Sequence, residues 1–215
     1  MGNVSATSAV SRAGISKPRQ DPEARRKHIL EATARCVRRS GFHGASMADI
    51  AAEAKLSVGI IYRYFANKEA IIEAIVAADL ADLRAKFAEF DDVPDDKVLD
   101  TLLDGLEQAL EHKYTPDTAA LALEVLAEAA RNPRVAAMVA GADAQERELG
   151  RGLCRRLTPG SPPVDIDARS EILAAMFDGV MMRVISNPDL DRKGLVVGMR
   201  YIMRQMLTLP AIPRD

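Results

Sequence analysis

Apolar residues recur at intervals of three and four positions along most of the chain, from about residue 23 to residue 207. This spacing places them on one face of successive α-helices, and the alternation typical of β-strands is missing. Ala, Leu, Met and Arg, which favour helices, are abundant. The pattern therefore predicts an all-α protein.

Capping residues divide this pattern into separate helices. Four helix starts carry a capping residue followed by proline at the first helical position: Asp21-Pro22, Thr115-Pro116, Asn132-Pro133 and Asn187-Pro188. Five more are expected at Ser46, at Ser57, at Asn67, near Pro94 and near Asp165. We therefore expect nine helices. The predicted ranges that matter most below are 22 to 40, 68 to 90, 165 to 186 and 189 to 208.

The segment 46–68 has the most specific local pattern. Ser46 and Asp49 form a capping box at the start of a short helix whose apolar residues follow the i, i+3, i+4, i+7 spacing. Ser57 is a suitable N-cap for a second short helix, and Asn67 for a longer third one. A helix, a tight turn, a helix and then a long helix is a layout typical of DNA-binding proteins.

The distribution of charge supports this interpretation. Residues 1–65 contain 11 Lys and Arg against 5 Asp and Glu, whereas residues 66–215 contain 18 against 26. A basic end on a protein with a net charge of −2 is the electrostatic footprint expected of a DNA-facing surface. The alternative is a solvated charged surface that has no partner.

Individual residues of this segment match a known family. They are Gly41-Phe42, Met47, Ile50-Ala51, Leu56-Ser57, Gly59, Tyr62, Tyr64-Phe65, Lys68-Glu69 and Ile71. Over about 45 residues the chain resembles the DNA-binding domain of the TetR family of bacterial transcriptional regulators. The resemblance implies a helix-turn-helix DNA-binding domain at 21–66 and a helical ligand-binding and dimerisation domain at 67–215. Residues 1–20 are expected to form a disordered basic arm.

Two departures from the family pattern affect the expected DNA contacts. Lys55 stands where relatives usually have a glycine, and a left-handed backbone there costs about 1 kcal/mol relative to Gly. Val58 and Ile60 stand where polar or basic residues are common in relatives. We therefore expect apolar contact with thymine methyl groups and few hydrogen bonds to bases.

The expected DNA-binding residues combine three kinds of contact. Free N–H groups at helix N-termini and tyrosine hydroxyls suit phosphate oxygens, and Arg63 suits a base edge or a phosphate. The full set is Ser46, Met47, Ser57, Val58, Gly59, Ile60, Tyr62, Arg63, Tyr64 and Lys68. Tyr62 has partial packing in the core as its alternative role. Double-stranded DNA is the expected partner.

The family resemblance also implies a dimer and an effector. Two C-terminal helices, at about 165–208, are rich in apolar residues and are expected to pair with a second copy; the alternative is that they complete the core of a monomer. An unidentified small molecule is expected to bind between the middle helices. Candidate ligand residues are Tyr114, Glu124, Met138, Arg147, Met176 and Met181. The alternative for the methionines is core packing, and the alternative for the polar residues is a surface position or an interhelical contact.

Other function classes find little support. The three histidines are scattered, and neither metal-ligand spacing nor a phosphate-binding loop is present, so we expect no enzyme, no cofactor and no metal site. No stretch is apolar enough to span a bilayer. Cys36 and Cys154 give no disulfide framework, which fits the cytoplasm.

These observations predict a transcriptional repressor. It is expected to bind a palindromic operator as a homodimer and to be released when a small molecule binds. Two alternatives stay open: an activator or a regulator controlled by a protein partner, and a helical interaction protein that has lost DNA recognition.

Overall fold

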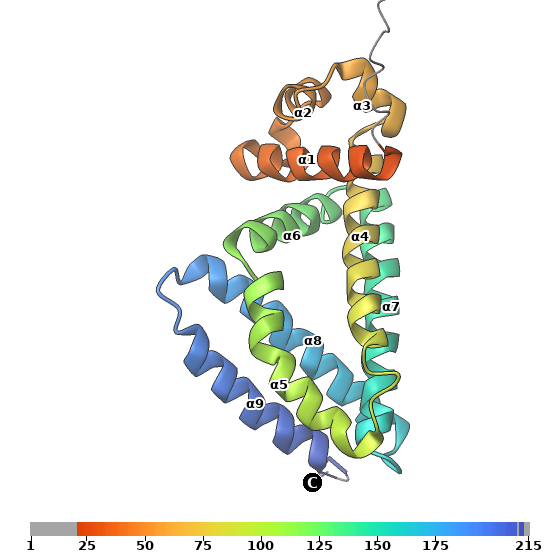
Figure 1. The fold of residues 1–215 in the computed structure, drawn as a ribbon, viewed down its shortest axis with the longest axis vertical. Helices are drawn as coiled ribbons and strands as arrows, with labels where there is room; N and C mark the ends of the chain where they lie inside the picture. The colour runs from red at the N-terminus through yellow and green to blue at the C-terminus, as the bar shows by residue number, and fades with distance from the viewer. Residues whose placement is uncertain (1–20, 210, 213–215) are drawn as a thin grey trace, which may run out of the picture.

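The computed structural model describes residues 21–209 and 211–212, and in these residues the chain forms nine helices and no strand, as predicted (Figure 1). The helices are α1 (Pro22–Gly44), α2 (Met47–Glu53), α3 (Val58–Tyr64), α4 (Lys68–Ala88), α5 (Asp95–Lys113), α6 (Pro116–Ala129), α7 (Pro133–Leu157), α8 (Pro163–Ser186) and α9 (Arg192–Thr208). The predicted basic arm lies outside the described residues. Among the described helices, none is both long enough and apolar enough to cross a membrane.

Most helix starts use the predicted caps. The side chain of Asn67 accepts a hydrogen bond from the Ala70 N–H at 2.8 Å, and Asp21, Thr115 and Asn132 cap α1, α6 and α7 in the same way. The first helix loses regular geometry at Gly41, whose φ is 69°, so its regular part ends at the predicted residue 40. Local sequence signals therefore place most helix boundaries correctly.

The start of the last helix was predicted wrongly. Asn187 is the C-cap of α8, and its carbonyl accepts a hydrogen bond from the Leu190 N–H at 3.1 Å, which closes a turn around Pro188. The N-cap of α9 is Asp191, whose carboxylate accepts from the Gly194 N–H at 3.0 Å. An Asn-Pro pair fits a turn as well as a helix start, and here the turn forms.

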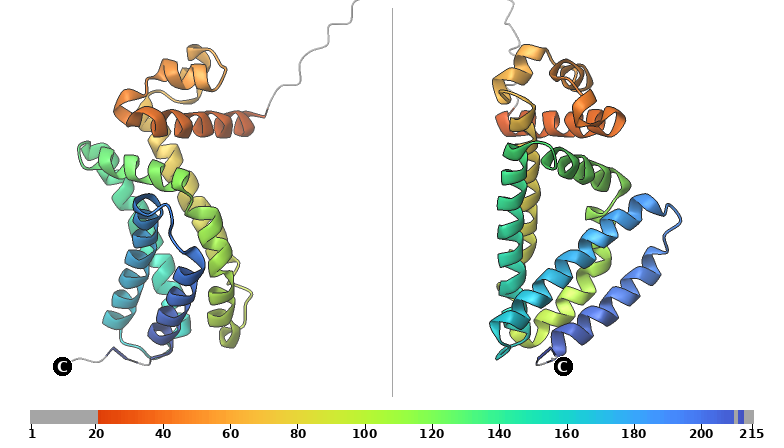
Figure 2. Two further views of the ribbon diagram at one scale, coloured as in Figure 1. Left: turned by 90° about the vertical axis from the view of Figure 1, so that its left-hand side faces the viewer. Right: turned by 180° about the vertical axis from the view of Figure 1, so that it is seen from behind.

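The helices are arranged in an upper and a lower part (Figures 1 and 2). We call α1 to α3 the N-terminal head; α4 descends from it and packs along α7. Helix α6 packs beneath α1, and α5, α8 and α9 form the lower part. The long α4 thus connects the head with the remaining helices.

The buried apolar residues form two cores. The upper core fills the head and the beginning of α4, and Val125 of α6 and Val135 of α7 belong to it. The lower core joins α5, the end of α7, α8 and α9. The head therefore shares its core with helices that lie more than 50 positions later in the sequence.

Candidate nucleic-acid interface

The start of α2 is fixed by the predicted capping box. The Asp49 N–H donates to the Ser46 hydroxyl oxygen at 3.1 Å, and the Ser46 N–H donates to the Asp49 carboxylate at 2.9 Å. The Ser46 hydroxyl also donates to that carboxylate, at 2.6 Å, and this hydrogen bond, followed by the one from the Ser46 N–H, lowers the pKa of Asp49. The buried side chains of Met47, Ile50 and Ala51 hold the other face of α2 against the core.

The turn between α2 and α3 adopts the strained geometry expected from the sequence. Lys55 has a φ of 54°, the only left-handed non-glycine residue in the described chain. The turn is closed by a hydrogen bond from the Leu56 N–H to the Ala51 carbonyl at 2.9 Å. The His28 ring nitrogen Nε2 lies 2.8 Å from the Ala54 carbonyl. This contact from α1 was not predicted, because the two residues are 26 positions apart.

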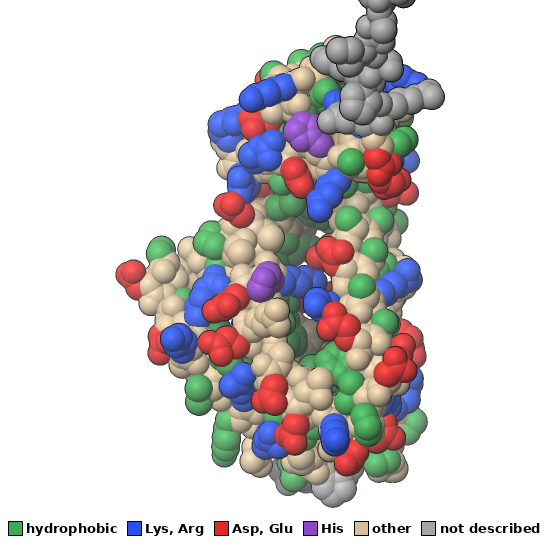
Figure 3. All heavy atoms as spheres, in the orientation of Figure 1, with side chains coloured by type: hydrophobic (Ala, Val, Ile, Leu, Met, Phe, Trp, Pro, Cys, Tyr) green, Lys and Arg blue, Asp and Glu red, His purple; other side chains and the backbone are tan. Residues whose placement is uncertain are grey.

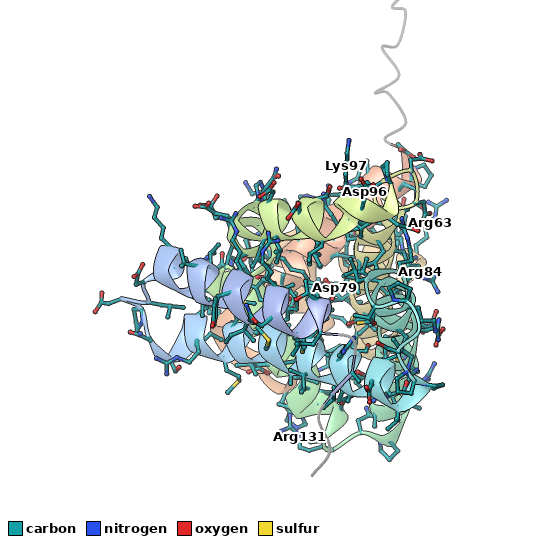
Figure 4. All side chains as sticks on the ribbon, turned by 90° about the horizontal axis from the view of Figure 1, so that it is seen from below. Arg63, Asp79, Arg84, Asp96, Lys97 and Arg131 are labelled. Atoms are coloured by element: carbon teal, nitrogen blue, oxygen red, sulfur yellow. The ribbon has the colours of Figure 1, made fainter. Side chains whose placement is uncertain are left out.

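One face of α3 packs on the core and the other faces solvent. Ile61 is fully buried, whereas the Tyr62 side chain is 53% exposed. Arg63 is exposed as well and lies at the edge of the molecule in Figure 4. Gly59 has open space where a side chain would begin. The helix therefore offers a surface that can approach another molecule closely.

The other predicted DNA-binding residues differ in accessibility. Ser46, Ser57 and Val58 are exposed, whereas Ile60 and Tyr64 are half-buried. The Met47 side chain is buried, so only its backbone N–H is available for a contact. Lys68 donates from Nζ to the Phe42 carbonyl at 2.8 Å, so its ammonium group also holds α4 against the end of α1.

Further basic residues of α1 contact α2 and the end of α3. The Arg26 guanidinium lies 4.6 Å from the centre of the Phe65 ring, a cation–π contact. Arg35 and Arg39 both pair with Glu53, and these hydrogen bonds lower the pKa of that carboxylate. Figure 3 shows many Lys and Arg side chains on the head. The predicted set did not include these arginines, although they share the basic segment.

The six candidate ligand residues lie in different surroundings. Glu124 accepts a hydrogen bond from the Phe42 N–H at 3.1 Å, so it contacts the head. Arg147 pairs with Asp143 and Glu171, between α7 and α8. The Tyr114 ring stacks on Phe177 with 6.0 Å between ring centres, and Met176 also packs against the lower core. The remaining two, Met138 and Met181, are half-buried.

Carboxylates from three helices lie close enough to Tyr114 to act on its hydroxyl. Burial, followed by the negative charges of Asp178, Asp79 and Glu146, raises the pKa of the Tyr114 hydroxyl well above its usual range. Burial is also the main cause that raises the pKa of Glu146 and of Asp178. Asp79 of α4 is exposed, and its label lies near the centre of the view along the molecule in Figure 4. Sequence reasoning missed this group, because its members are far apart in the chain.

The lower part also leaves apolar side chains uncovered. Most of the large apolar residues exposed in the described chain lie on α8, on α9 or just after α9: Val164, Ile172, Met182, Ile185, Val197, Tyr201, Ile202 and Leu209. A groove of about 350 Å³ lies beside some of them and is lined by residues such as Ile172, Tyr201 and Leu209. An apolar patch of this kind on a folded chain is typical of a protein interface.

The chain matches two family models. Residues 29–75 match the bacterial regulatory proteins of the tetR family, and residues 99–207 match the C-terminal domain of BetI-type transcriptional repressors. The regulator UidR of Escherichia coli K12 is 26% identical over 189 residues, which cover 85% of this chain and 93% of UidR. PksA of Bacillus subtilis is 38% identical over 91 residues, which cover 40% of this chain and 44% of PksA.

Solved structures show the same fold. Salmonella enterica GusR superposes with a TM-score of 0.71 and 25% identity, covering 90% of this chain and all of GusR. A regulator from Saccharomonospora viridis in complex with choline has a TM-score of 0.64 and 22% identity, with 90% of this chain and all of that one covered. The family-model matches include the helix-turn-helix and more than half of the chain. The chain belongs to the TetR family and is a helix-turn-helix transcriptional regulator.

Proposed function

We propose that this regulator is a repressor that binds a palindromic operator as a homodimer in the cytoplasm and leaves it when a small molecule binds. The main support for DNA binding is that α3 has two different faces: Ile61 is buried on one, and Tyr62 and Arg63 are exposed on the other. Phosphate contacts from the basic head supply affinity, since each releases counterions. The apolar residues Val58 and Ile60 suit contact with thymine methyl groups.

Substitution of the exposed face tests this function. Tyr62→Ala combined with Arg63→Ala is expected to weaken binding to a duplex selected by the wild-type protein at least about tenfold, and to reduce its salt dependence. Arg84→Ala is the matched control, because Arg84 is an exposed cation of α4 that contacts Gln145, far from the head. Equal affinities of the double variant and the control, measured by fluorescence anisotropy, would reject the proposed interface.

The dimer is proposed from the exposed face of α8 and α9. A second copy related by a two-fold axis covers the same residues on both chains, so the apolar patch pairs with itself. The two heads then face half-sites that lie about 34–36 Å apart or a multiple of that distance. An effector releases the operator only if it binds the non-binding arrangement more tightly than the binding one.

We further propose that the effector is a small organic cation. Asp79, Glu146 and Asp178 place negative charge around the Tyr114 ring, and Lys113, which pairs with Asp79 at 3.4 Å, offsets only part of it. A cation between the carboxylates and the aromatic ring would be stabilised by the negative charge of the former and by a cation–π contact with the latter. The solved relative that contains choline supports this choice.

Choline serves as the probe for this proposal. Saturating choline is expected to raise the melting temperature of the wild-type protein, because it binds the folded state only. Asp178→Asn is expected to reduce that rise, and Asp96→Asn, an exposed carboxylate at the start of α5, is expected to leave it unchanged. Stabilisation of the wild type by an acyl-CoA but not by choline would reject a cationic effector.

A further inference from the structure

Phe42 lies at the point where the chain leaves α1 and turns toward α2. Its side chain is buried in the upper core, and both of its backbone polar groups are bound by charged side chains. The N–H donates to Glu124 Oε2 at 3.1 Å, and the carbonyl accepts from Lys68 Nζ at 2.8 Å. Hydrogen bonds to charged groups are stronger than those between neutral groups. One residue of the head is therefore held by α6 on one side and by α4 on the other.

The backbone beside Phe42 is shaped for this contact. Gly41 has a φ of 69°, a conformation that side chains rarely adopt. A Cβ atom at this position would lie 3.3 Å from Glu124 Oε2. Glycine at position 41 thus serves two purposes: it lets the chain turn, and it leaves room for the carboxylate.

Other contacts of α6 also join this helix to the head. Asp117 forms an ion pair with Arg38 of α1, and Val125 is buried in the upper core. Leu121 and Ala129 pack against that core as well. Because Glu124 lies in the middle of this helix, a shift of α6 displaces the carboxylate from the Phe42 N–H.

We infer that Glu124 is a positioning residue for DNA binding: it fixes the corner between α1 and α2, and through it the orientation of α3. The proposal rests on the proposed function. It assigns to Glu124 a role different from the ligand contact that the sequence suggested. Glu124 affects the position of α3 in the head and not the charge of the DNA-facing surface. Specific binding to an operator is therefore expected to depend on Glu124, whereas non-specific binding is not.

The test compares Glu124 with Glu111, an exposed carboxylate of α5. We expect Glu124→Leu to weaken binding to a duplex selected by the wild-type protein at least about tenfold, with unchanged affinity for a random duplex, since positioning affects the specific complex. Glu124→Gln, which keeps an acceptor oxygen, is expected to have a smaller effect. Glu111→Leu and Glu111→Gln are the matched controls. Lys68 is left unchanged, because its ammonium is also a predicted phosphate contact.

Hydrogen exchange of the free protein tests the contact between Glu124 and Phe42 in the absence of DNA. Amides of residues 41–46 are expected to exchange at least about fivefold faster in Glu124→Leu than in Glu111→Leu, because the local opening becomes easier. Unchanged exchange in this segment, or equal specific affinities of the Glu124 and Glu111 variants, would overturn the inference. If circular dichroism shows that Glu124→Leu does not fold, the affinity and exchange measurements are made on Glu124→Gln and its control Glu111→Gln. A wild-type protein that selects no duplex contradicts the proposed function, while the exchange result still tests the contact.

Discussion

The N-terminal head and the α8–α9 pair use their apolar residues in opposite ways. In the head, Ile29, Ile50 and Ile61 are almost completely buried, and the large side chains that α3 exposes are those of Val58, Tyr62 and Arg63. On α9, Tyr201 is 68% exposed and Ile202 is 51% exposed. The apolar residues of the head are thus enclosed within the chain, in part by α4, α6 and α7, whereas the lower helices leave an apolar face that a second copy can cover. The head is thus suited to a charged partner, and the α8–α9 pair to an apolar one.

A charge on the uncovered face gives the largest expected effect. Tyr201→Glu places two carboxylates in the proposed interface, one from each copy, and is expected to weaken dimerisation at least about a hundredfold, because buried unpaired charges are costly. Analytical ultracentrifugation measures the dissociation constant. Leu126→Glu, at an exposed apolar position of α6, is the matched control. Equal dimer stability in the two variants would contradict an interface on α9.

A cavity in the head is expected to cost about 2–4 kcal/mol of unfolding free energy. Ile29→Ala removes buried aliphatic carbons from the upper core, whereas Val197→Ala removes exposed methyl groups and should change the free energy by less than about 0.5 kcal/mol. Both are best measured by urea unfolding in the Tyr201→Glu background, where dissociation does not add to the unfolding free energy. Similar costs at the two positions would remove the contrast between the two regions.

The sequence predicted the head in more detail than the lower helices, for a physical reason. Caps such as Ser46 and Asn67, and the turn at Lys55, depend on residues within about four positions, so the local sequence specifies them. The start of α9 was missed because Asn187 and Pro188 fit a turn as well as a cap. A local sequence pattern therefore predicts the backbone conformation only where the pattern is compatible with a single conformation.

Contacts between distant residues could not be predicted in this way. Glu124 was a ligand candidate because it is a polar residue on a middle helix, and the structure places it on the Phe42 N–H, 82 positions away. The carboxylates around Tyr114 come from α4, α7 and α8, and only the packing of these helices brings them together. The type of a residue alone does not predict which other helix its side chain contacts.

A smaller effect is expected at the turn of the head. Lys55→Gly relieves the left-handed backbone, and part of this gain is offset by the greater freedom of glycine in the unfolded chain, so the net stabilisation is about 0.5–1 kcal/mol. Lys55→Ala keeps the strain and serves as the control. Urea unfolding measures both. A gain of equal size in the alanine variant would show that removal of the charge, and not of the strain, is responsible.

The smallest effect concerns the charge of the lower helices. Burial, opposed by Lys113 and reinforced by Asp79, raises the pKa of Glu146 in the folded protein. A carboxyl group with a raised folded pKa favours folding when protonated, and this contribution is lost as the pH rises through the folded pKa. Glu146→Gln should therefore be more stable than the wild type near neutral pH, and the difference should shrink toward about pH 4, where the unfolded carboxyl group also takes up its proton. Urea unfolding across this range measures the difference, and Asp178→Asn should follow the same trend because burial raises that pKa too. A Glu146→Gln variant that is less stable than the wild type near neutral pH, with a deficit that disappears on acidification, would mean that Glu146 is stabilised as a carboxylate, and the lower helices would then lack the electrostatic character that distinguishes them from the head.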